Sequence, residues 1–238
     1  TGAPTADLHM FSTGDGALAS CMPRIEALIQ EIKQRVAVVC TDNSPPDKSI
    51  PTAPLDNINS VAQSIDYLCS QGHKRIGFIT GLDDSDIGRD RLAGYTIALQ
   101  HHNISEDGDL VFRGDYSFAT GKKGADYFLS INNPPSAIMC ANDTMAINAI
   151  KEIISKGFDV PDDISIIGFD DITIAAQITP ALTTVSVPVR EIAKQSFRLL
   201  RMAMNENEAT YQHTVLPCKL VLRDTTTLTR EKLTAADS

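Results

Sequence analysis

The sequence has no long hydrophobic run and no excess of positive charge, and each absence argues against a class of protein. No stretch of about 18 or more uncharged apolar residues occurs, so no membrane span is predicted. The first ten residues lack a basic segment followed by an apolar one, which argues against a secretory signal. The 238 residues carry a net charge of −9, whereas nucleic-acid affinity comes largely from Lys and Arg. This segment is therefore not expected to bind DNA by itself.

The sequence also lacks the residue spacings that carry metal or covalent chemistry. No pair of the five cysteines has zinc-like or CxxC spacing, and the five histidines form no HxxxH pattern. No nucleophile elbow or P-loop is present. We therefore predict no catalytic residue, no metal and no cofactor. The scattered cysteines are expected to be reduced, mostly buried thiols of a cytoplasmic protein.

What the sequence does contain is a regular alternation of short apolar runs and helical patterns. The runs are rich in Val and Ile and bounded by Gly, Pro or Asp, which is typical of buried parallel strands. They cover residues 36–41, 76–80, 110–112, 137–140, 164–168 and 183–187. Apolar residues at helical spacing predict helices over 58–69, 89–102, 117–129, 144–156 and 189–204. This order predicts a doubly wound α/β fold, in which ligands bind beyond the carboxyl ends of the strands.

Four side chains are predicted to meet at that edge of the sheet. Arg91 offers a rigid fork of donors to adjacent hydroxyls, and Asp170 can accept from two hydroxyls. Asn142 can donate and accept together, while Tyr116 offers a flat face to a sugar ring or a base. This set fits a polyhydroxylated ligand and predicts a small-molecule site.

Each of these residues also fits a purely structural role without ligand contact, and the sequence does not decide between the two roles. Asn142, Asp143 and Asp171 lie where helices begin, so they also fit helix caps. Arg91 and Asp170 each fit a structural ion pair, and Tyr116 fits an ordinary core position.

One short pattern points to a different class of protein. Residues 14–19 read Gly-Asp-Gly-Ala-Leu-Ala, which fits the GxGxxA dinucleotide fingerprint, and Asp42 ends the next strand. The strand before the pattern is short, Asp15 would lie near a pyrophosphate, and the pattern is common by chance. A nucleotide-dependent enzyme is therefore the weaker hypothesis.

Several motifs in a fixed order resemble the LacI/GalR family of transcriptional repressors. Residues 72–81 are similar to the family's GH+RIGFI.G signature. The other motifs are residues 91–95, 135–138 with 141–143, 160–171, 182–185 and 222–226. The resemblance runs from about residue 6 to residue 227, and the order of the motifs makes it specific.

The resemblance implies a type I periplasmic-binding-protein fold, with two lobes and a small effector, a sugar or a nucleoside, between them. It also implies a homodimer that acts on operator DNA through an N-terminal headpiece. The effector-contacting positions of the family correspond here to Asp42, Arg91, Tyr116, Asn142 and Asp170. Four of these five are the residues that the strand-end argument selects independently.

The chain departs from the family pattern near its start. The headpiece has no counterpart in these residues, and residues 6–12 and 36–42 resemble the third and fourth strands of the first lobe. We therefore expect an incomplete first lobe and a complete second one. The expected division is residues 1–55 with 188–213, then residues 56–187 with 214–228, and a tail over 229–238.

The effector class stays open at this level. Residues 72–77, 113–118 and 134–137 look most similar to the cytidine-responsive members of the family, and Tyr116 could stack on a base. Stacking does not distinguish among bases, and a hexose fits the same residues nearly as well. A secreted sugar-binding protein of the same fold is an alternative that would share the pocket but not the repressor-like motifs.

Overall fold

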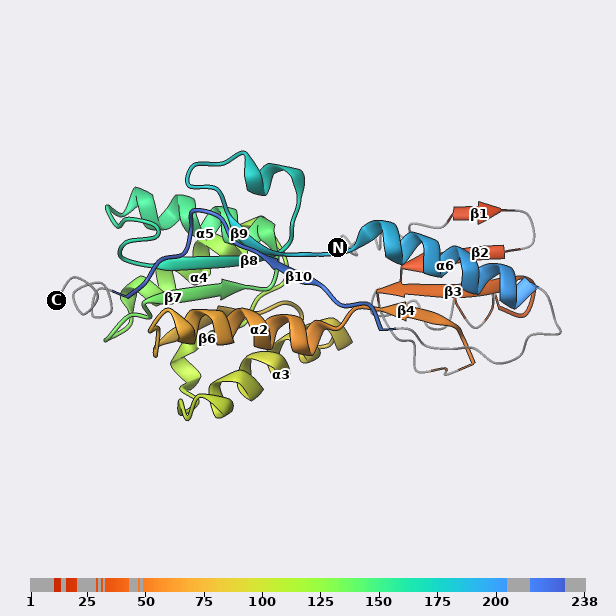
Figure 1. Cartoon of the computed structure of the whole chain (residues 1–238), viewed down its shortest axis with the longest axis horizontal. Coiled ribbons are helices and arrows are strands. Elements are labelled where there is room, and N and C mark those ends of the chain that lie inside the picture. The colour runs from red at the N-terminus through yellow and green to blue at the C-terminus, as the bar shows by residue number, and fades with distance from the viewer. Residues whose placement is uncertain are drawn as a thin grey trace, which may run out of the picture. The chain divides into compact units, whose positions relative to one another are not determined.

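The chain divides into two compact units, shown in Figure 1. Unit 1 comprises Thr1–Asp56 and Pro188–Pro217, and unit 2 comprises Asn57–Val187 and Cys218–Ser238. The structure is a computed structural model, and it describes residues 11–13, 16–20, 29, 31, 33–42, 47, 49–204 and 215–229.

Unit 1 is built on a four-stranded sheet in the order β1-β2-β3-β4. The hairpin of β1 (Phe11–Thr13) and β2 (Gly16–Ser20) is antiparallel. The pairs β2–β3 and β3–β4 are parallel, with β3 at Ala37–Asp42 and β4 at Thr52–Pro54. Helix α6 (Val189–Met204) packs on β3 and β4, as Figure 1 shows.

The described core of unit 1 includes two small apolar clusters on the two faces of β3. Successive residues of a strand point to opposite faces of the sheet, so neighbouring valines of β3 enter different clusters. The cluster under α6 contains Val39, Ala53, Leu199 and Leu200. The other cluster contains Ile29, Val38, Cys40 and Ile50.

In unit 1 the structure rules out the weaker hypothesis, a dinucleotide site, and shows that the expectation of reduced cysteines is wrong for Cys40. The dinucleotide fingerprint requires a helix to begin within the glycine pattern, but Gly16–Ser20 is a strand that pairs with β1 and β3. Cys40 is disulfide-bonded rather than reduced, whereas Cys69, Cys140 and Cys218 are free thiols. Residues 6–12 resemble the family's third strand, and the first part of this segment, residues 6–10, lies outside the described residues.

Unit 2 is built on a six-stranded sheet in the order β10-β9-β8-β7-β5-β6. All neighbouring strands are parallel except β10, which pairs antiparallel with β9. The strands are β5 (Ile76–Ile79), β6 (Val111–Phe112), β7 (Ala137–Cys140), β8 (Ser165–Asp170), β9 (Thr183–Ser186) and β10 (Lys219–Val221). The central strands are buried along their length, which explains their continuous apolar runs.

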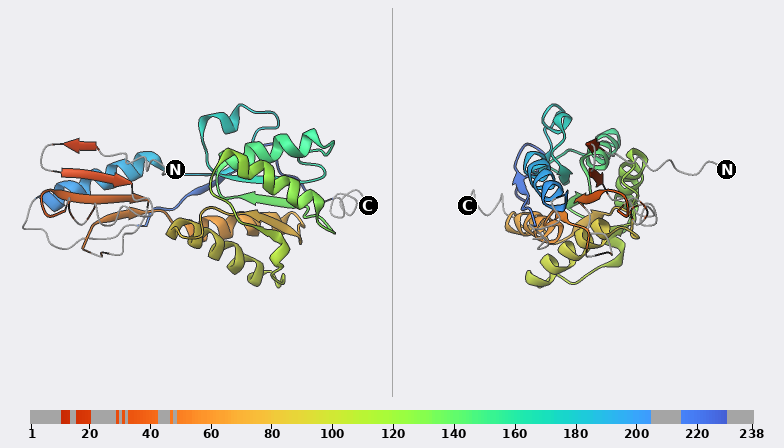
Figure 2. Two further views of the ribbon diagram at one scale, coloured as in Figure 1. Left: turned by 180° about the vertical axis from the view of Figure 1, so that it is seen from behind. Right: turned by 90° about the vertical axis from the view of Figure 1, so that its right-hand side faces the viewer.

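Two pairs of helices cover this sheet. They are α2 (Asn57–Ser70) with α3 (Asp86–His101), and α4 (Phe118–Ser130) with α5 (Asp143–Ser155). Figures 1 and 2 show the two pairs on opposite faces of the sheet. Short 3-10 helices, η1 (Gly108–Leu110) and η2 (Thr173–Ala176), lie in connecting segments.

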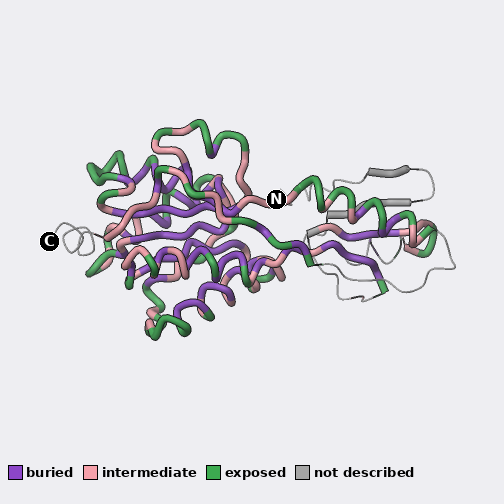
Figure 3. Tube along the Cα trace, in the orientation of Figure 1, coloured by how far each residue is buried: buried purple, intermediate pink, exposed green. Residues whose placement is uncertain are grey.

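The predicted α/β fold with parallel sheets is confirmed. Figure 3 shows buried residues along the central strands of unit 2 and along parts of its helices. Among the described helices, none has the length and apolar content needed to cross a membrane.

Candidate functional site

The parallel strands of unit 2 end at one edge of the sheet, and the predicted site residues lie in the segments beyond that edge. Asn142 follows the end of β7, and Asp170 is the last residue of β8. Tyr116 lies in the loop after β6, and Arg91 lies in α3, the helix that follows β5. The topology therefore brings these four residues, which are distant in sequence, to the same edge of one unit.

Arg91 is the most constrained of the four residues. It is 4% exposed, its Nε donates to Asn57 Oδ1 at 2.9 Å, and its Nη1 donates to the carbonyl oxygen of Ala141. The guanidinium carbon lies 3.5 Å from the centroid of the Phe169 ring. A guanidinium that is held by two hydrogen bonds and a ring face has a fixed orientation before any ligand arrives.

Asp170 faces the Arg91 guanidinium across a gap. Arg91 Nη2 lies 4.0 Å from Asp170 Oδ1, which is longer than a hydrogen bond of roughly 2.7–3.2 Å. The Asp170 side chain is 39% exposed, whereas that of Arg91 is almost fully buried. The two groups are therefore close enough to act on one ligand group, but their contact is not a tight structural ion pair.

Asn142 and Tyr116 are linked to each other. The Asn142 amide nitrogen donates to the Tyr116 carbonyl oxygen at 3.1 Å, and its Oδ1 accepts from the Met145 N–H at 2.8 Å. Asn142 is thus the N-cap of α5, as its structural interpretation held. Tyr116 has a φ of 63°, and its ring lies directly over Gly81, where a Cβ atom would come within 1.9 Å of Tyr116 Cζ.

Asp143 and Asp171 are not helix caps, contrary to one interpretation of the sequence. Asp143 is buried, and its carboxylate accepts from the Thr184 hydroxyl and, at 2.9 Å, from the Ile172 N–H. Asp171 pairs with Arg223 Nη2 at 2.6 Å. Burial raises the pKa of Asp143 to about 6, although both hydrogen bonds favour the charged form. Local position suggests a cap, but tertiary partners determine what these carboxylates do.

The fifth predicted residue, Asp42, belongs to unit 1. It is the last residue of β3, and its side chain lies outside the described part of the chain. Its role in ligand binding stays a prediction of the sequence.

Sequence reasoning missed the residues that hold Arg91. Asn57 opens α2 and lies 34 positions from Arg91, so no local motif connects them. Phe169 precedes Asp170 and reads as an ordinary strand residue, although its ring underlies the guanidinium. The sequence signal that could have indicated a role for Asn57 is that a polar residue stands on the buried face of the amphipathic helix α2.

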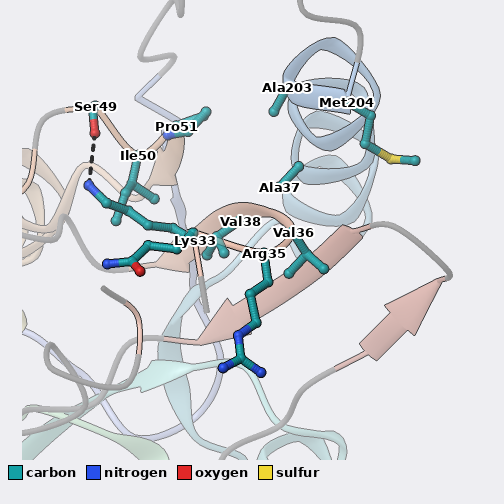
Figure 4. Close-up of a pocket in the computed structure, with 11 residues that line it drawn as sticks. Lys33, Arg35, Val36, Ala37, Val38, Ser49, Ile50, Pro51, Ala203 and Met204 are labelled. Atoms are coloured by element: carbon teal, nitrogen blue, oxygen red, sulfur yellow. Dashed lines mark hydrogen bonds between the residues drawn. The ribbon is translucent and has the colours of Figure 1, made fainter. Parts of the chain in front are cut away.

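The predicted site residues that the structure describes form no metal centre, and they do not line the pocket in Figure 4. Among the described residues, no group of three or more His, Cys, Asp or Glu side chains could hold a metal ion. A pocket of about 640 Å³ in unit 1 is lined by residues 33–38, 49–51 and 203–204 (Figure 4). Lys33 in this pocket is already paired with Asp47. None of the predicted site residues lines the pocket, so it is not the predicted ligand site.

A second pocket, of about 390 Å³, lies in unit 2 at the segments that precede β5 and β7. It contains His73, whose Nδ1 lies 2.9 Å from Ser136 Oγ and whose Nε2 lies 3.2 Å from the Thr227 carbonyl oxygen. Burial lowers the pKa of His73. These contacts make His73 a core histidine that ties the C-terminal segment to the sheet.

Comparison with known proteins gives this arrangement a family. Residues 65–226 match the periplasmic binding protein-like domain. The HTH-type transcriptional repressor CytR of Escherichia coli K12 is 34% identical over 222 residues, which are 92% of this chain and 65% of that protein. A LacI-family regulatory protein from Chloroflexus aggregans superimposes with a TM-score of 0.80 at 30% identity, covering 89% of this chain and 76% of that one. A complex of the transcriptional regulator CelR with cellobiose superimposes with a TM-score of 0.82 at 28% identity, covering 89% and 65%.

The chain therefore belongs to the periplasmic binding protein-like family, within its branch of LacI-type regulators. The resemblance inferred from the motifs is confirmed. The chain spans about two thirds of the length of CytR, as the 65% coverage shows.

Proposed function

We propose that this chain is the effector-sensing part of a LacI-type transcriptional regulator, and that unit 2 binds a small polyhydroxylated molecule at the carboxyl edge of its sheet. The observation that carries the proposal is the preset Arg91 guanidinium, whose Nη2 lies 4.0 Å from the carboxylate of Asp170. One hydroxyl group can accept from the guanidinium and donate to the carboxylate at the same time.

The chemistry of this pair favours vicinal hydroxyl groups. Two contacts of Arg91, to Asn57 and to the Ala141 carbonyl, use only part of the five donors of a guanidinium. The remaining donors and the two carboxylate oxygens of Asp170 together match adjacent hydroxyls of a sugar ring or a ribose. Because Arg91 is ordered without ligand, binding does not have to fix its side chain, which limits the entropic cost.

The effector is a sugar or a nucleoside. The CelR structure contains cellobiose, and another similar structure is that of a sugar-binding LacI-family regulator from Escherichia coli, which supports a sugar. The half-buried Tyr116 and the cytidine-responsive likeness of residues 113–118 support a nucleoside. Asn142 contributes the one amide hydrogen atom and the one oxygen lone pair that its contacts with Tyr116 and Met145 do not use.

We further propose that this segment regulates DNA binding without touching DNA. Its net charge of −9 opposes contact with phosphates, so operator DNA would be bound by a headpiece outside these residues. In keeping with the family, the regulator would act as a homodimer in the cytoplasm, and it would not catalyse a reaction. The similarity to transcriptional repressors such as CytR favours this function over secreted sugar binding.

A thermal-shift screen of the full chain tests the proposal. Cytidine, adenosine, cellobiose and a set of hexoses are added at increasing concentration, because a ligand at 100 times its dissociation constant adds about 2.7 kcal/mol of stability. We expect one class to raise the melting temperature of the wild-type protein clearly more than that of Asp170→Asn. Asp109→Asn, the same change at an exposed residue near the opposite edge of the sheet, is expected to respond as the wild type does. No shift with any compound, or an equal shift in Asp170→Asn, would contradict the proposal.

A further inference from the structure

The backbone that carries Asp170 has an unusual conformation. Asp170 has a φ of 116° and Asp171 has a φ of 58°, so two successive residues lie in the region that L side chains rarely adopt. Non-glycine residues persist in such a conformation only when their surroundings impose it. The turn that ends β8 therefore needs support from neighbouring elements.

The first support is the buried carboxylate of Asp143 at the start of α5. It accepts from the Ile172 N–H at 2.9 Å and from the Thr184 hydroxyl of β9. It also lies against the backbone of β8, because a Cβ atom at Gly168 would come within 2.2 Å of Asp143 Oδ1. Asp143 thus fixes the residue immediately after the turn, and glycine at position 168 makes room for the carboxylate.

The second support is Arg223, in the segment after β10. Its Nη2 lies 2.6 Å from Asp171 Oδ1, and its Nη1 donates to the Leu182 carbonyl oxygen at 2.7 Å. Its own N–H donates to Thr183 Oγ1 at 2.9 Å. Arg223 therefore ties the second residue of the turn to β9.

We propose that Asp143 and Arg223 are positioning residues of the ligand site, which act on ligand through the backbone of Asp170. The inference rests on the proposed function, because it assigns a role relative to the ligand that Asp170 binds. Asp143 holds the turn at Ile172 and Arg223 holds it at Asp171, so the Asp170 carboxylate stays opposite Arg91. Both carboxylate oxygens of Asp143 and both Nη atoms of Arg223 have partners within the protein, which separates their role from that of Asp170.

A double-mutant cycle separates positioning from general stability. Affinities of the full chain for cytidine, adenosine, cellobiose and glucose are measured by calorimetry in the wild type, Asp143→Ala, Asp170→Asn and the double variant. We expect Asp143→Ala to weaken binding of the compound that the wild type binds by tenfold or more. The same change should have little further effect in the Asp170→Asn background, because the group that it positions is already altered.

Three further variants complete the test. Asp143→Asn keeps an acceptor for the Ile172 N–H and should restore most of the affinity. Arg223→Ala should weaken binding, and its effect should not add to that of Asp143→Ala. Asp107→Ala, which breaks an ion pair with Arg75 before β5, should lower stability without changing affinity.

Amide hydrogen exchange supplies a readout that does not need a ligand. In Asp143→Ala the Ile172 amide should exchange faster, while the Met145 amide, bonded to Asn142, should keep its rate. Unchanged affinity in Asp143→Ala, or an equal loss in both backgrounds, would overturn the inference while leaving the proposed function intact. A wild-type chain that binds none of the four compounds would instead overturn the proposed function, and this inference with it.

Discussion

Replacing Asp143 by Asn should change how the stability of unit 2 depends on pH. The carboxylate is buried and accepts from the Thr184 hydroxyl and the Ile172 N–H. An asparagine of the same shape can accept from the Ile172 N–H and donate to the Thr184 hydroxyl, but it does not titrate. The variant therefore removes the ionisation while keeping the packing.

The magnitude follows from the pKa of Asp143. Burial raises this pKa from 3.8 to about 6 in the folded protein, which is a shift of roughly two units at 1.36 kcal/mol each. Because the folded pKa is the higher one, the native state binds the proton more tightly than the unfolded state does. Its stabilising contribution is present below about pH 4 and is lost as the pH rises to about 6. The free energy of unfolding of Asp143→Asn relative to wild type should thus increase by about 2 kcal/mol from pH 4 to pH 7.

Urea denaturation at four pH values between 4 and 7 measures this difference. Tyrosine fluorescence reports mainly on unit 2, since four of the five tyrosines, Tyr67, Tyr95, Tyr116 and Tyr127, lie in it and the chain has no tryptophan. Asp107→Asn is the control, because a hydrogen bond from Arg75 lowers the pKa of Asp107 and gives its contribution the opposite pH dependence. Parallel curves for wild type and Asp143→Asn would refute the argument that this carboxylate is held in a buried site.

Two further predictions concern packing. Gly81→Ala should destabilise unit 2 by about 1–3 kcal/mol in urea denaturation, because the new Cβ would lie 1.9 Å from Tyr116 Cζ and must displace the ring. Gly108→Ala, whose Cβ would have nothing within 4 Å, should leave stability nearly unchanged, and equal effects of the two changes would count against this packing. Amides of β3 should exchange about tenfold or more faster than those of β7, because the two apolar clusters described in unit 1 hold four buried residues each. Equal protection of the two strands by hydrogen exchange would contradict that expectation.

The order of strands and helices in unit 2 could be predicted because periodicity and bounding residues are local signals. The helix predicted over 189–204 is observed as Val189–Met204, and the strand predicted over 137–140 is observed as Ala137–Cys140. The rule that parallel strands present their carboxyl ends at one edge was enough to assign Arg91, Tyr116 and Asp170 to the same edge of the sheet.

The supporting contacts could not be predicted, since they join residues far apart in the chain. Asn57 and Arg91 are 34 positions apart, and Asp143 and Thr184 are 41 positions apart. Local sequence assigns Asp143 to a helix start, where capping is the usual role, but burial against β8 gives it two other partners. Likewise, nothing in an apolar strand that ends in two aspartates indicates that Asp170 has a φ of 116°.

A crystal structure of the chain with the compound that stabilises it tests the central claim most directly. We predict one ligand hydroxyl oxygen within about 3.2 Å of both Arg91 Nη2 and an Asp170 carboxylate oxygen, so that it bridges the two groups, which lie 4.0 Å apart. The contacts of Arg91 with Asn57 and the Ala141 carbonyl should be unchanged from the ligand-free structure. A ligand bound without contact to either Arg91 or Asp170, for example in the pocket lined by residues 33–38, would contradict it.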